Sequence, residues 1–391
     1  MEDLRIGIDV RAAAEVPAGR GRVVRELLRT LAGLDYRHRY ILYAREAWAQ
    51  AELDERFQWR LLDAKDPWWH WRAARAANGE CDVFLSSNSY LTSRFLRIPS
   101  VAIVYDLATF ERSLRPQRRA RTIERLTLGM AVKRSAKLLA ISQATAEALI
   151  NRFPGAASRT VVAPLGVAPG LAGAGNGSAG LDADGASAGH GLDAAQTAML
   201  PASGFVLAVG TLEPRKNLPR LVEAYAGMPR ELQHKHPLVV VGALGWETNG
   251  TLGSLQSLGE RCTMLGYVSD AALAELYRRC AVFCYPSLGE GFGLPVLEAM
   301  AAGAAVLTSN VSSLPEVGGE AVAYADPTEA LAIGEQLQRL LRDESLRAEL
   351  STRARERAQE FSWEAFAETV LAVLEESAGV PARIADPALS A

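Results

Sequence analysis

Short apolar runs alternate along this chain with longer stretches in which apolar residues recur every three or four positions. Apolar runs without a polar face are typical of buried parallel strands, whereas the longer stretches are typical of amphipathic helices. One such stretch carries Val24, Leu27, Leu28 and Leu31. The apolar runs lie at 4–10, 40–43, 57–61, 81–85, 101–104, 138–142, 160–166, 205–210, 238–242, 262–268, 281–285 and 304–308. This pattern predicts an α/β protein whose mostly parallel sheets are covered by helices on both faces.

A stretch rich in Gly, Ala, Ser and Asp interrupts this pattern at 171–200. It carries almost no large apolar side chains, so it cannot bury enough surface to order itself. We therefore expect a flexible linker or insertion there, between an N-terminal domain at 1–170 and a second domain at 201–361. A C-terminal helix is expected at 362–376, and the 391 residues suffice for two domains of ordinary size.

The most informative loop follows the apolar run at 281–285. It reads Pro-Ser-Leu-Gly-Glu-Gly-Phe-Gly-Leu, and Pro295 then suits the first turn of a helix, where its missing N–H costs nothing. Exposed amides at a helix N-terminus bind anions, and glycines let a ligand approach the backbone closely. The residues of this expected anion site are Gly291, Phe292, Gly293 and Leu294.

Two carboxylates flank this anion site. Glu290 lies on the loop and Glu298 in the first helical turn, with seven residues between them, so both can face one ligand. Such a site suits a nucleotide-sugar, because the amides can bind the diphosphate and the carboxylates can bind hydroxyls of the ribose and the sugar. A second anion site is expected where Gly210 opens the loop that carries Arg215 and Lys216. Arginine binds two oxygens side by side, and lysine supplies a point charge.

In the first half, ligand-binding loops are expected at the carboxyl ends of the strands, as in other open parallel sheets. The first such loop holds Gly19 and Gly21, but Val24 stands where the dinucleotide fingerprint has its third glycine, which argues against NAD. A turn without any ligand is the alternative for these glycines. The run at 101–104 ends in Tyr105 and Asp106, two polar residues at such a loop.

The stretch 285–303, with its spacing of Glu290 and Glu298, resembles the retaining glycosyltransferases of family four, as does Gly-Thr-Leu-Glu-Pro-Arg-Lys-Asn at 210–217. The resemblance runs from residue 7 to about residue 374 and is most specific over 205–320. It implies the GT-B fold, in which two Rossmann-like domains face each other across an interdomain cleft. It also implies that the C-terminal helix crosses back to the first domain.

The resemblance implies a hexosyltransferase that moves mannose or a related hexose with retention of configuration and without a metal ion. The donor would be a nucleotide-diphosphate sugar, with a GDP-sugar favoured over a UDP- or dTDP-sugar, and no cofactor is expected. The acceptor would be a glycan or a lipid-linked molecule in cell-surface polysaccharide or glycoconjugate synthesis. A non-catalytic nucleotide-sugar-binding homologue or subunit and a sugar epimerase stay open as alternatives.

The resemblance also assigns roles in the second domain. Arg215 and Lys216 would neutralise the leaving diphosphate, and Glu290 would hold sugar hydroxyls and steady positive charge at the reacting carbon. Glu298 would hold the ribose. The segment that ends at Val268 would line the nucleobase with backbone groups.

In the first domain, Gly19 and Gly21 would belong to a loop that closes over the donor phosphates. Many relatives carry His-Asp where this chain has Tyr105 and Asp106. The tyrosine hydroxyl could still contact the sugar, but a contact that depends on histidine is placed in doubt. Asp106 would either bind the ligand or brace the loop.

The charges are unevenly distributed. Residues 1–170 carry 27 Lys and Arg against 18 Asp and Glu, while the remainder carries 15 against 27. Nine of the basic residues lie between Arg112 and Lys137, with apolar positions interleaved. A solvated helix face explains such a stretch, and peripheral contact of 112–137 with an anionic membrane is the functional alternative. No nucleic-acid-binding motif accompanies the charge.

Trp68, Trp69 and Trp71 form a second ambiguous cluster, which indicates either packing against the domain or a surface for sugar stacking or a membrane interface. The four cysteines and five histidines show no metal-ligand spacing, so we expect reduced core thiols and no metal site. The sequence shows neither a signal peptide nor an apolar run of membrane-spanning length. We therefore expect a cytoplasmic protein, with or without contact at the inner face of the membrane.

Overall fold

The computed structural model describes residues 3–16, 19–34, 38–49, 52–110, 118–167, 171, 192, 194–201, 204–243, 245 and 249–380. Most of the expected linker at 171–200 and the first part of the basic stretch at 112–137 lie outside these residues. The described residues fall into two compact units. The first takes the chain up to Phe110, residues 118–166 and the chain from Trp363 onward, and the second takes residues 167–362.

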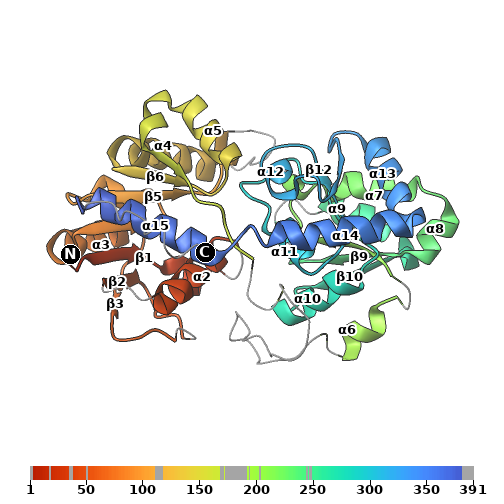
Figure 1. Cartoon of the computed structure of the whole chain (residues 1–391), viewed down its shortest axis with the longest axis horizontal. Helices are drawn as coiled ribbons and strands as arrows, with labels where there is room; N and C mark the ends of the chain where they lie inside the picture. Colours follow the sequence, from red (N-terminus) through yellow and green to blue (C-terminus); the bar gives the residue numbers. More distant parts are fainter. Residues whose placement is uncertain are drawn as a thin grey trace, which may run out of the picture. The chain divides into compact units, whose positions relative to one another are not determined.

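The first unit contains a seven-stranded parallel sheet in the order β3-β2-β1-β4-β5-β6-β7 (Figure 1). The inner strand β1 (Arg5–Asp9) is buried except at its first residue, because it lies between β2 and β4. The other strands are β2 (Arg39–Ala44), β3 (Phe57–Leu61), β4 (Val83–Ser86), β5 (Ser100–Val104), β6 (Lys137–Ala140) and β7 (Thr160–Val162).

Helices cover both faces of this sheet. α15 (Trp363–Ser377) packs on α2 (Arg20–Gly33) and on strands β4, β5 and β6, and Figure 1 shows it in blue beside them. α3 (Trp68–Glu80) connects β3 to β4, and α4 (Arg118–Arg134) connects β5 to β6, so both connections run toward β7. The connection from β1 to β2 through α2 runs toward β3, in the opposite direction. Because such crossovers are right-handed, α3 and α4 lie on the face of the sheet opposite α2. The remaining helices are α1 (Arg11–Glu15), α5 (Gln143–Arg152), η1 (Thr92–Arg94), η2 (Ala108–Phe110) and η3 (Pro154–Arg159).

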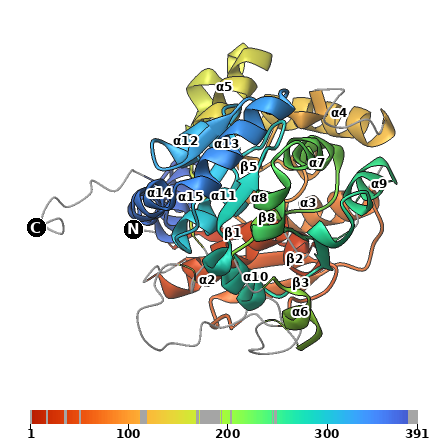
Figure 2. The same ribbon diagram turned by 90° about the vertical axis from the view of Figure 1, so that its right-hand side faces the viewer.

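The second unit contains a six-stranded parallel sheet in the order β10-β9-β8-β11-β12-β13. Figure 2 turns the view so that α7 (Leu218–Ala226) and α8 (Arg230–Lys235) of this unit face the viewer. Its core joins Leu221 and Tyr225 of α7, Leu238 of β9, and Ile333 and Leu337 of α13. The strands are β8 (Val206–Val209), β9 (Leu238–Val241), β10 (Cys262–Gly266), β11 (Val282–Tyr285), β12 (Val306–Ser309) and β13 (Ala323–Ala325). The sequence did not predict β13, because its three residues make too short an apolar run.

The helices of the second unit lie between these strands in the chain. They are α6 (Ala194–Met199), α7 (Leu218–Ala226), α8 (Arg230–Lys235), α9 (Asn249–Gln256), α10 (Asp270–Arg279), α11 (Leu294–Ala301), α12 (Leu314–Gly318), α13 (Ala330–Arg342), α14 (Glu344–Ala358), η4 (Pro214–Lys216) and η5 (Gly259–Arg261). No helix in the described part of the chain is long and apolar enough to cross a membrane. The two parallel sheets with their covering helices confirm the predicted class of two Rossmann-like units.

Candidate active site

The carboxyl edge of the second unit's sheet brings three of the predicted residues together. β8 leads into η4, which carries Arg215 and Lys216, and β11 leads into the loop that carries Glu290. The two strands are neighbours in the sheet, so the loops that leave them meet. Leu288 N–H donates to the carbonyl of Arg215 at 2.9 Å and joins one loop to the other.

Glu290 is the acceptor at the centre of this network. Its Oε1 accepts hydrogen bonds from Lys216 Nζ at 2.8 Å, Tyr285 Oη at 2.8 Å and Ser287 Oγ at 2.7 Å. Its Oε2 accepts a hydrogen bond from Arg215 Nη1 at 2.5 Å. Three donors crowd Oε1, which has two lone pairs, whereas the contacts of Oε2 leave one of its lone pairs for a further donor.

Burial and charge act against each other in this network. Burial alone would raise the pKa of Glu290, but Lys216 and Arg215 outweigh that effect and hold its pKa at about 2. Burial also lowers the pKa of Lys216 from its ordinary value, although the charge of Glu290 opposes the shift. Burial and the neighbouring Glu290 raise the pKa of Tyr285 well above its ordinary value, so its hydroxyl remains a donor.

Glu213 supplies a second carboxylate that the sequence did not mark as a site residue. Its Oε1 lies 2.9 Å from Arg215 Nη2 and 3.1 Å from Nε of the same guanidinium. The two cations of the site, Arg215 and Lys216, therefore face two carboxylates, Glu213 and Glu290. An anionic ligand that binds these cations competes with both carboxylates for them.

Serine side chains hold the Glu290 loop in place. Glu290 N–H donates to Ser312 Oγ at 2.9 Å, and Ser313 Oγ donates to the carbonyls of Glu290 at 3.0 Å and Phe292 at 2.8 Å. Both serines follow β12, the strand next to β11. The resemblance covers this segment but marked neither serine as a site residue, and the rule that adjacent strand ends meet could have found their role.

Asn217 fixes the loop that carries the cations. It has a left-handed backbone with φ of 60°, and its side-chain amide donates to the carbonyls of Pro286 at 2.9 Å and Pro327 at 2.7 Å. Asparagine tolerates this conformation better than most residues. The sequence analysis assigned it no role, because both partners are distant along the chain.

The expected anion site lies at the N-terminus of α11. Gly293 caps the helix with φ of 108°, and its carbonyl accepts hydrogen bonds from Val296 and Leu297 N–H. A Cβ at Gly293 would lie 2.9 Å from Leu314 Cδ2, so glycine suits both the conformation and the space. The amides of Phe292, Gly293 and Leu294 have no acceptor among the residues that the structure describes.

The remaining predicted residues of the second unit have individual surroundings. Glu298, on α11, is buried, and Tyr277 Oη donates to its Oε2 at 3.3 Å. Val268 is buried two residues after β10. Gly291 precedes Phe292 on the loop and is buried. Their roles toward a ligand stay predictions.

Three glycines line the carboxyl ends of β8, β9 and β10. Gly210, Gly242 and Gly266 all have positive φ, and only Gly210 was marked from the sequence. A Cβ at Gly242 would lie 2.1 Å from the carbonyl oxygen of Gly210, and one at Gly210 would lie 3.2 Å from Lys216 Cε. Glycine at 242 therefore allows the ends of β8 and β9 to approach each other closely, and glycine at 210 leaves room for the side chain of Lys216.

The predicted residues of the first unit form a separate group. Gly19 caps α2 with φ of 56°, and a Cβ at Gly21 would lie 1.7 Å from the carbonyl oxygen of Val16. Arg20, between these glycines, lies over the ring of Tyr105 with its guanidinium carbon 5.5 Å from the ring centre. The loops after β1 and β5 thus meet. The backbone of Val16 leaves no room for a side chain at position 21, so glycine is needed there whether or not a ligand binds.

Tyr105 and Asp106 are held by their own chain. Tyr105 is buried, and its hydroxyl donates to the carbonyl of Ser87 at 2.7 Å, so only a lone pair remains for a ligand. Burial raises the pKa of this hydroxyl, which keeps its proton. Asp106 Oδ1 accepts a hydrogen bond from Ala108 N–H at 3.0 Å, as expected of a residue that braces its loop.

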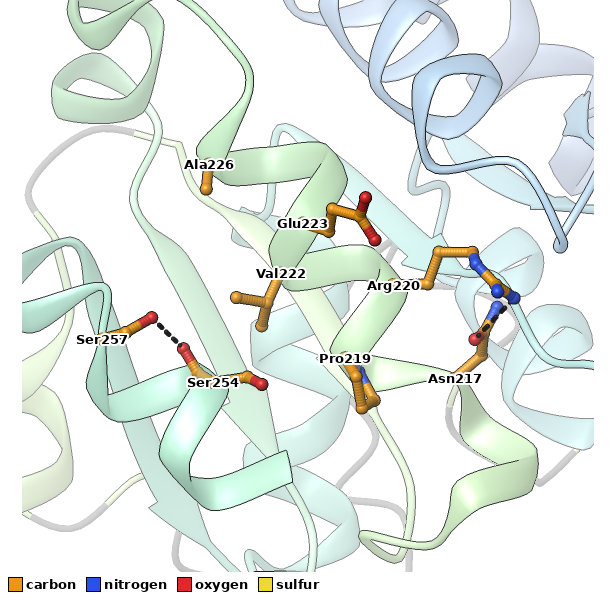
Figure 3. A pocket seen from close by; sticks show the side chains of 8 residues that line it. All are labelled: Asn217, Pro219, Arg220, Val222, Glu223, Ala226, Ser254 and Ser257. Carbon is orange, nitrogen blue, oxygen red and sulfur yellow. Dashed lines mark hydrogen bonds between the residues drawn. The ribbon is translucent and has the colours of Figure 1, made fainter. Parts of the chain in front are cut away.

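A pocket of about 470 Å³ lies elsewhere on the second unit, between α7 and α9 (Figure 3). Its lining includes Pro219, Glu223 and Ser254, but neither Arg215 nor Glu290. Figure 3 shows that the charged side chains of Arg220 and Glu223 line it together with polar and small apolar residues. In the described part of the chain, no group of three or more His, Cys, Asp or Glu residues could hold a metal ion.

Comparison with known proteins identifies the family. The Glycosyltransferase Family 4 model matches residues 17–170, and the Glycosyl transferases group 1 model matches residues 196–357. O-antigen chain mannosyltransferase B from Escherichia coli is 34% identical over 310 residues, which cover 78% of this chain and 73% of that protein. This chain belongs to glycosyltransferase family 4. It is an enzyme that transfers a sugar from a donor to an acceptor.

Other relatives match shorter segments. Serotype-specific mannosyltransferase WbdA from Escherichia coli is 40% identical over 163 residues, which cover 41% of this chain and 20% of that protein. Among solved structures, sucrose-phosphate synthase from Thermosynechococcus elongatus has a TM-score of 0.73 at 20% identity and covers 95% of this chain and 98% of its own. Anabaena HepE in complex with UDP-glucose has a TM-score of 0.72 at 19% identity, with 95% and 100% covered. The family and these structures confirm the predicted GT-B class.

Proposed function

We propose that this glycosyltransferase moves mannose or a related hexose from a nucleotide-diphosphate sugar to a glycan or lipid-linked acceptor. The observation that carries the proposal is the network in which Arg215 and Lys216 meet Glu290, in the loop that leads into α11. The relatives named mannosyltransferases, one of them of the O-antigen chain, support the sugar and a role in polysaccharide or glycoconjugate synthesis.

The donor diphosphate binds where the two cations and the helix N-terminus converge. Arg215 binds two phosphate oxygens side by side, Lys216 supplies a point charge, and the amides near Phe292 donate hydrogen bonds. Both cations are paired with Glu290, so the diphosphate must replace this carboxylate as their partner. Two ion pairs within the protein are then exchanged for two ion pairs with the donor.

This exchange gives Glu290 its role toward the sugar. While it accepts from four donors, most of its acceptor positions are taken. When the diphosphate takes Arg215 and Lys216, two positions open, and sugar hydroxyls occupy them. The negative charge of the carboxylate steadies positive charge at the reacting carbon.

Transfer proceeds with retention of configuration. The acceptor oxygen attacks the anomeric carbon on the face from which the diphosphate leaves, and a donor phosphate oxygen takes the acceptor proton. The leaving diphosphate gains negative charge, which Arg215, Lys216 and the amides at the start of α11 neutralise. No metal ion is required, because these groups of the chain supply the positive charge.

The favoured donor is a GDP-sugar, ahead of UDP- and dTDP-sugars. The enzyme acts in the cytoplasm, and the stretch 112–137 contacts the anionic inner face of the membrane. Glu298 holds the donor ribose, and the segment ending at Val268 lines the nucleobase. Nothing in the described residues favours the non-catalytic alternative.

The test is transfer by the purified chain in the presence of EDTA, with GDP-mannose, UDP-glucose and dTDP-glucose offered separately. We expect release of GDP and an α-linked product from GDP-mannose, as shown by NMR of the new anomeric proton. Inverted product, or activity that disappears with EDTA, would contradict the mechanism. Thermal stabilisation by GDP without any transfer would favour the non-catalytic alternative, since a ligand at about 100 times its dissociation constant adds about 2.7 kcal/mol.

A further inference from the structure

The tryptophan cluster of the first unit is split between the core and the surface. Trp69 is fully buried, whereas Trp68 is 68% exposed and Trp71 is 41% exposed. The two exposed residues lie three positions apart at the start of α3, so they share one face of the helix. An exposed tryptophan pair on one helix face is unusual for a protein surface that meets only water.

Cations surround this pair. Lys65, Arg72 and Arg75 are exposed, and the Arg75 guanidinium lies 5.5 Å from the centre of the Trp71 ring. The acidic neighbours are largely neutralised by other residues. Asp66 lies 2.8 Å from Arg45 Nη2, and Glu80 lies 2.8 Å from Arg60 Nη2. The face around the tryptophans is therefore positively charged.

The same layer of the first unit continues this charge. α3 and α4 both contact η1, and Arg134 Nε of α4 donates to the carbonyl of Ser93 in η1 at 3.2 Å. Ile123 and Leu126 of α4 are each 62% exposed. The exposed cations along the layer are Arg72 and Arg75 on α3, Arg94 and Arg97 in and after η1, and Lys133 and Arg134 on α4. We call this layer, from Trp68 to Arg134, the tryptophan–arginine face.

We propose that the tryptophan–arginine face docks on the surface of an anionic lipid bilayer, with Trp68 and Trp71 as its apolar anchors. Tryptophan rings are favoured at the depth of the lipid headgroups, because one edge is apolar and the other is polar. Each cation near an anionic bilayer contributes about 1 kcal/mol. Docking on α3 extends the membrane contact proposed for 112–137 and does not depend on the identity of the transferred sugar.

A soluble glycan fits this face less well. Sugar stacking needs an open ring face, and Arg75 lies over the ring of Trp71. A neutral glycan also gives no reason for the row of cations that continues through η1 to α4. Charge complementarity therefore points to the lipid surface.

The test is flotation of the purified chain with vesicles of phosphatidylcholine alone or with added phosphatidylglycerol. We expect binding to the anionic vesicles only. Trp68→Ala with Trp71→Ala should lower the partition coefficient at least about tenfold, equivalent to about 1.4 kcal/mol. Arg72→Glu with Arg75→Glu should lower it about thirtyfold or more, since two cations are lost. As a matched control, Arg339→Glu with Arg342→Glu changes two exposed arginines of α13 in the second unit and should leave binding unchanged.

Two further measurements keep the outcomes distinct. Lipids brominated near the headgroup should quench the tryptophan fluorescence of the chain, and Trp68→Phe with Trp71→Phe should remove most of that quenching. Transfer to a short soluble acceptor should stay unchanged in all these variants, so a failure of the proposed sugar transfer would be visible separately. Equal binding to neutral vesicles, or loss of soluble-oligosaccharide binding in the tryptophan variant without any vesicle binding, would overturn the proposal.

Discussion

Lys216 and Glu290 pair across two loops of the second unit, with Nζ donating to Oε1 at 2.8 Å although the residues are 74 positions apart. The pair forms because β8 and β11 are neighbours in a parallel sheet, so the loops that leave their carboxyl ends meet. Tyr285, the last residue of β11, donates to the same oxygen at 2.8 Å. A strand end therefore helps to hold this charge network in place.

Lys216→Ala should lower kcat by about 10²–10³, because one fixed positive charge no longer stabilises the leaving diphosphate. The KM for the acceptor should stay near its original value, since the lysine lies in the donor network. Initial rates at saturating donor and varied acceptor would measure both. Lys216→Arg retains a charge and should keep part of the activity. Equal losses in kcat and acceptor affinity would contradict a role on the leaving group.

Glu290→Gln should separate donor binding from transfer. The amide leaves Arg215 and Lys216 without their shared counter-ion, so GDP should bind about tenfold tighter, equivalent to about 1.4 kcal/mol. Transfer should nevertheless fall by about 10²–10³, because the charge near the reacting carbon is lost. Calorimetric titration with GDP and single-turnover rates would measure the two effects.

The Glu290→Gln result decides whether the exchange of ion pairs occurs. If the diphosphate does not displace Glu290, the variant should bind GDP as the unchanged enzyme does. Glu213→Gln is the matched control, since Glu213 pairs with Arg215 alone. It should tighten GDP binding less than Glu290→Gln does, because Lys216 keeps its partner.

Gly242→Ala tests the close approach of the strand ends. Gly242 has φ of 145°, and a Cβ there would lie 2.1 Å from the carbonyl oxygen of Gly210. We expect a loss of about 3 kcal/mol in the free energy of unfolding of the second unit, measured by urea denaturation. Gly253→Ala is the control, because Gly253 lies in α9 and a Cβ there meets nothing within 4 Å. It should stabilise the unit by up to about 1 kcal/mol.

Much of the fold was predictable because the strands are buried on both faces. The run at 101–104 became β5 (Ser100–Val104) and the run at 281–285 became β11 (Val282–Tyr285), since strands of this kind are continuously apolar. β13 escaped prediction because a run of three residues is too short to give a pattern. The tryptophan cluster shows another limit, since adjacent Trp68 and Trp69 have opposite burial, which depends on how α3 meets the sheet.

The candidate site was predictable only in part. The charged residues could be predicted, because the Arg215-Lys216 pair and the spacing of Glu290 and Glu298 are motifs of residues that lie close together in the sequence. Their partners were not marked, because Ser287 and Ser313 are ordinary residues whose importance arises from adjacent strand ends. The proposed binding of sugar hydroxyls by Glu290 stays a prediction, and the structure adds that four donors of its own chain contact this carboxylate.

His70 should make the stability of the first unit depend on pH between 4 and 6.5. It is buried on α3, with Nδ1 2.9 Å from Thr92 Oγ1 and Nε2 3.4 Å from Asp66 Oδ1. Burial and the positive charge of Arg11 lower its pKa from 6.5 to about 4, although Asp9 and Asp66 oppose the shift. Between these two pH values the unfolded chain binds a proton that the folded chain does not, so stability rises with pH in this window.

The free energy of unfolding should rise by about 3 kcal/mol across this pH window, because the pKa of one histidine differs between the folded and the unfolded chain. Urea denaturation from pH 4 to 7 would measure it, and His70→Gln should remove that part of the slope. His234→Gln, which changes an exposed histidine of α8, should leave the slope as it is. The same slope in the His70 variant and the unchanged enzyme would mean that His70 is protonated in the folded unit across this range. The hydrogen bond with Thr92 would then have to use Nδ1 as a donor.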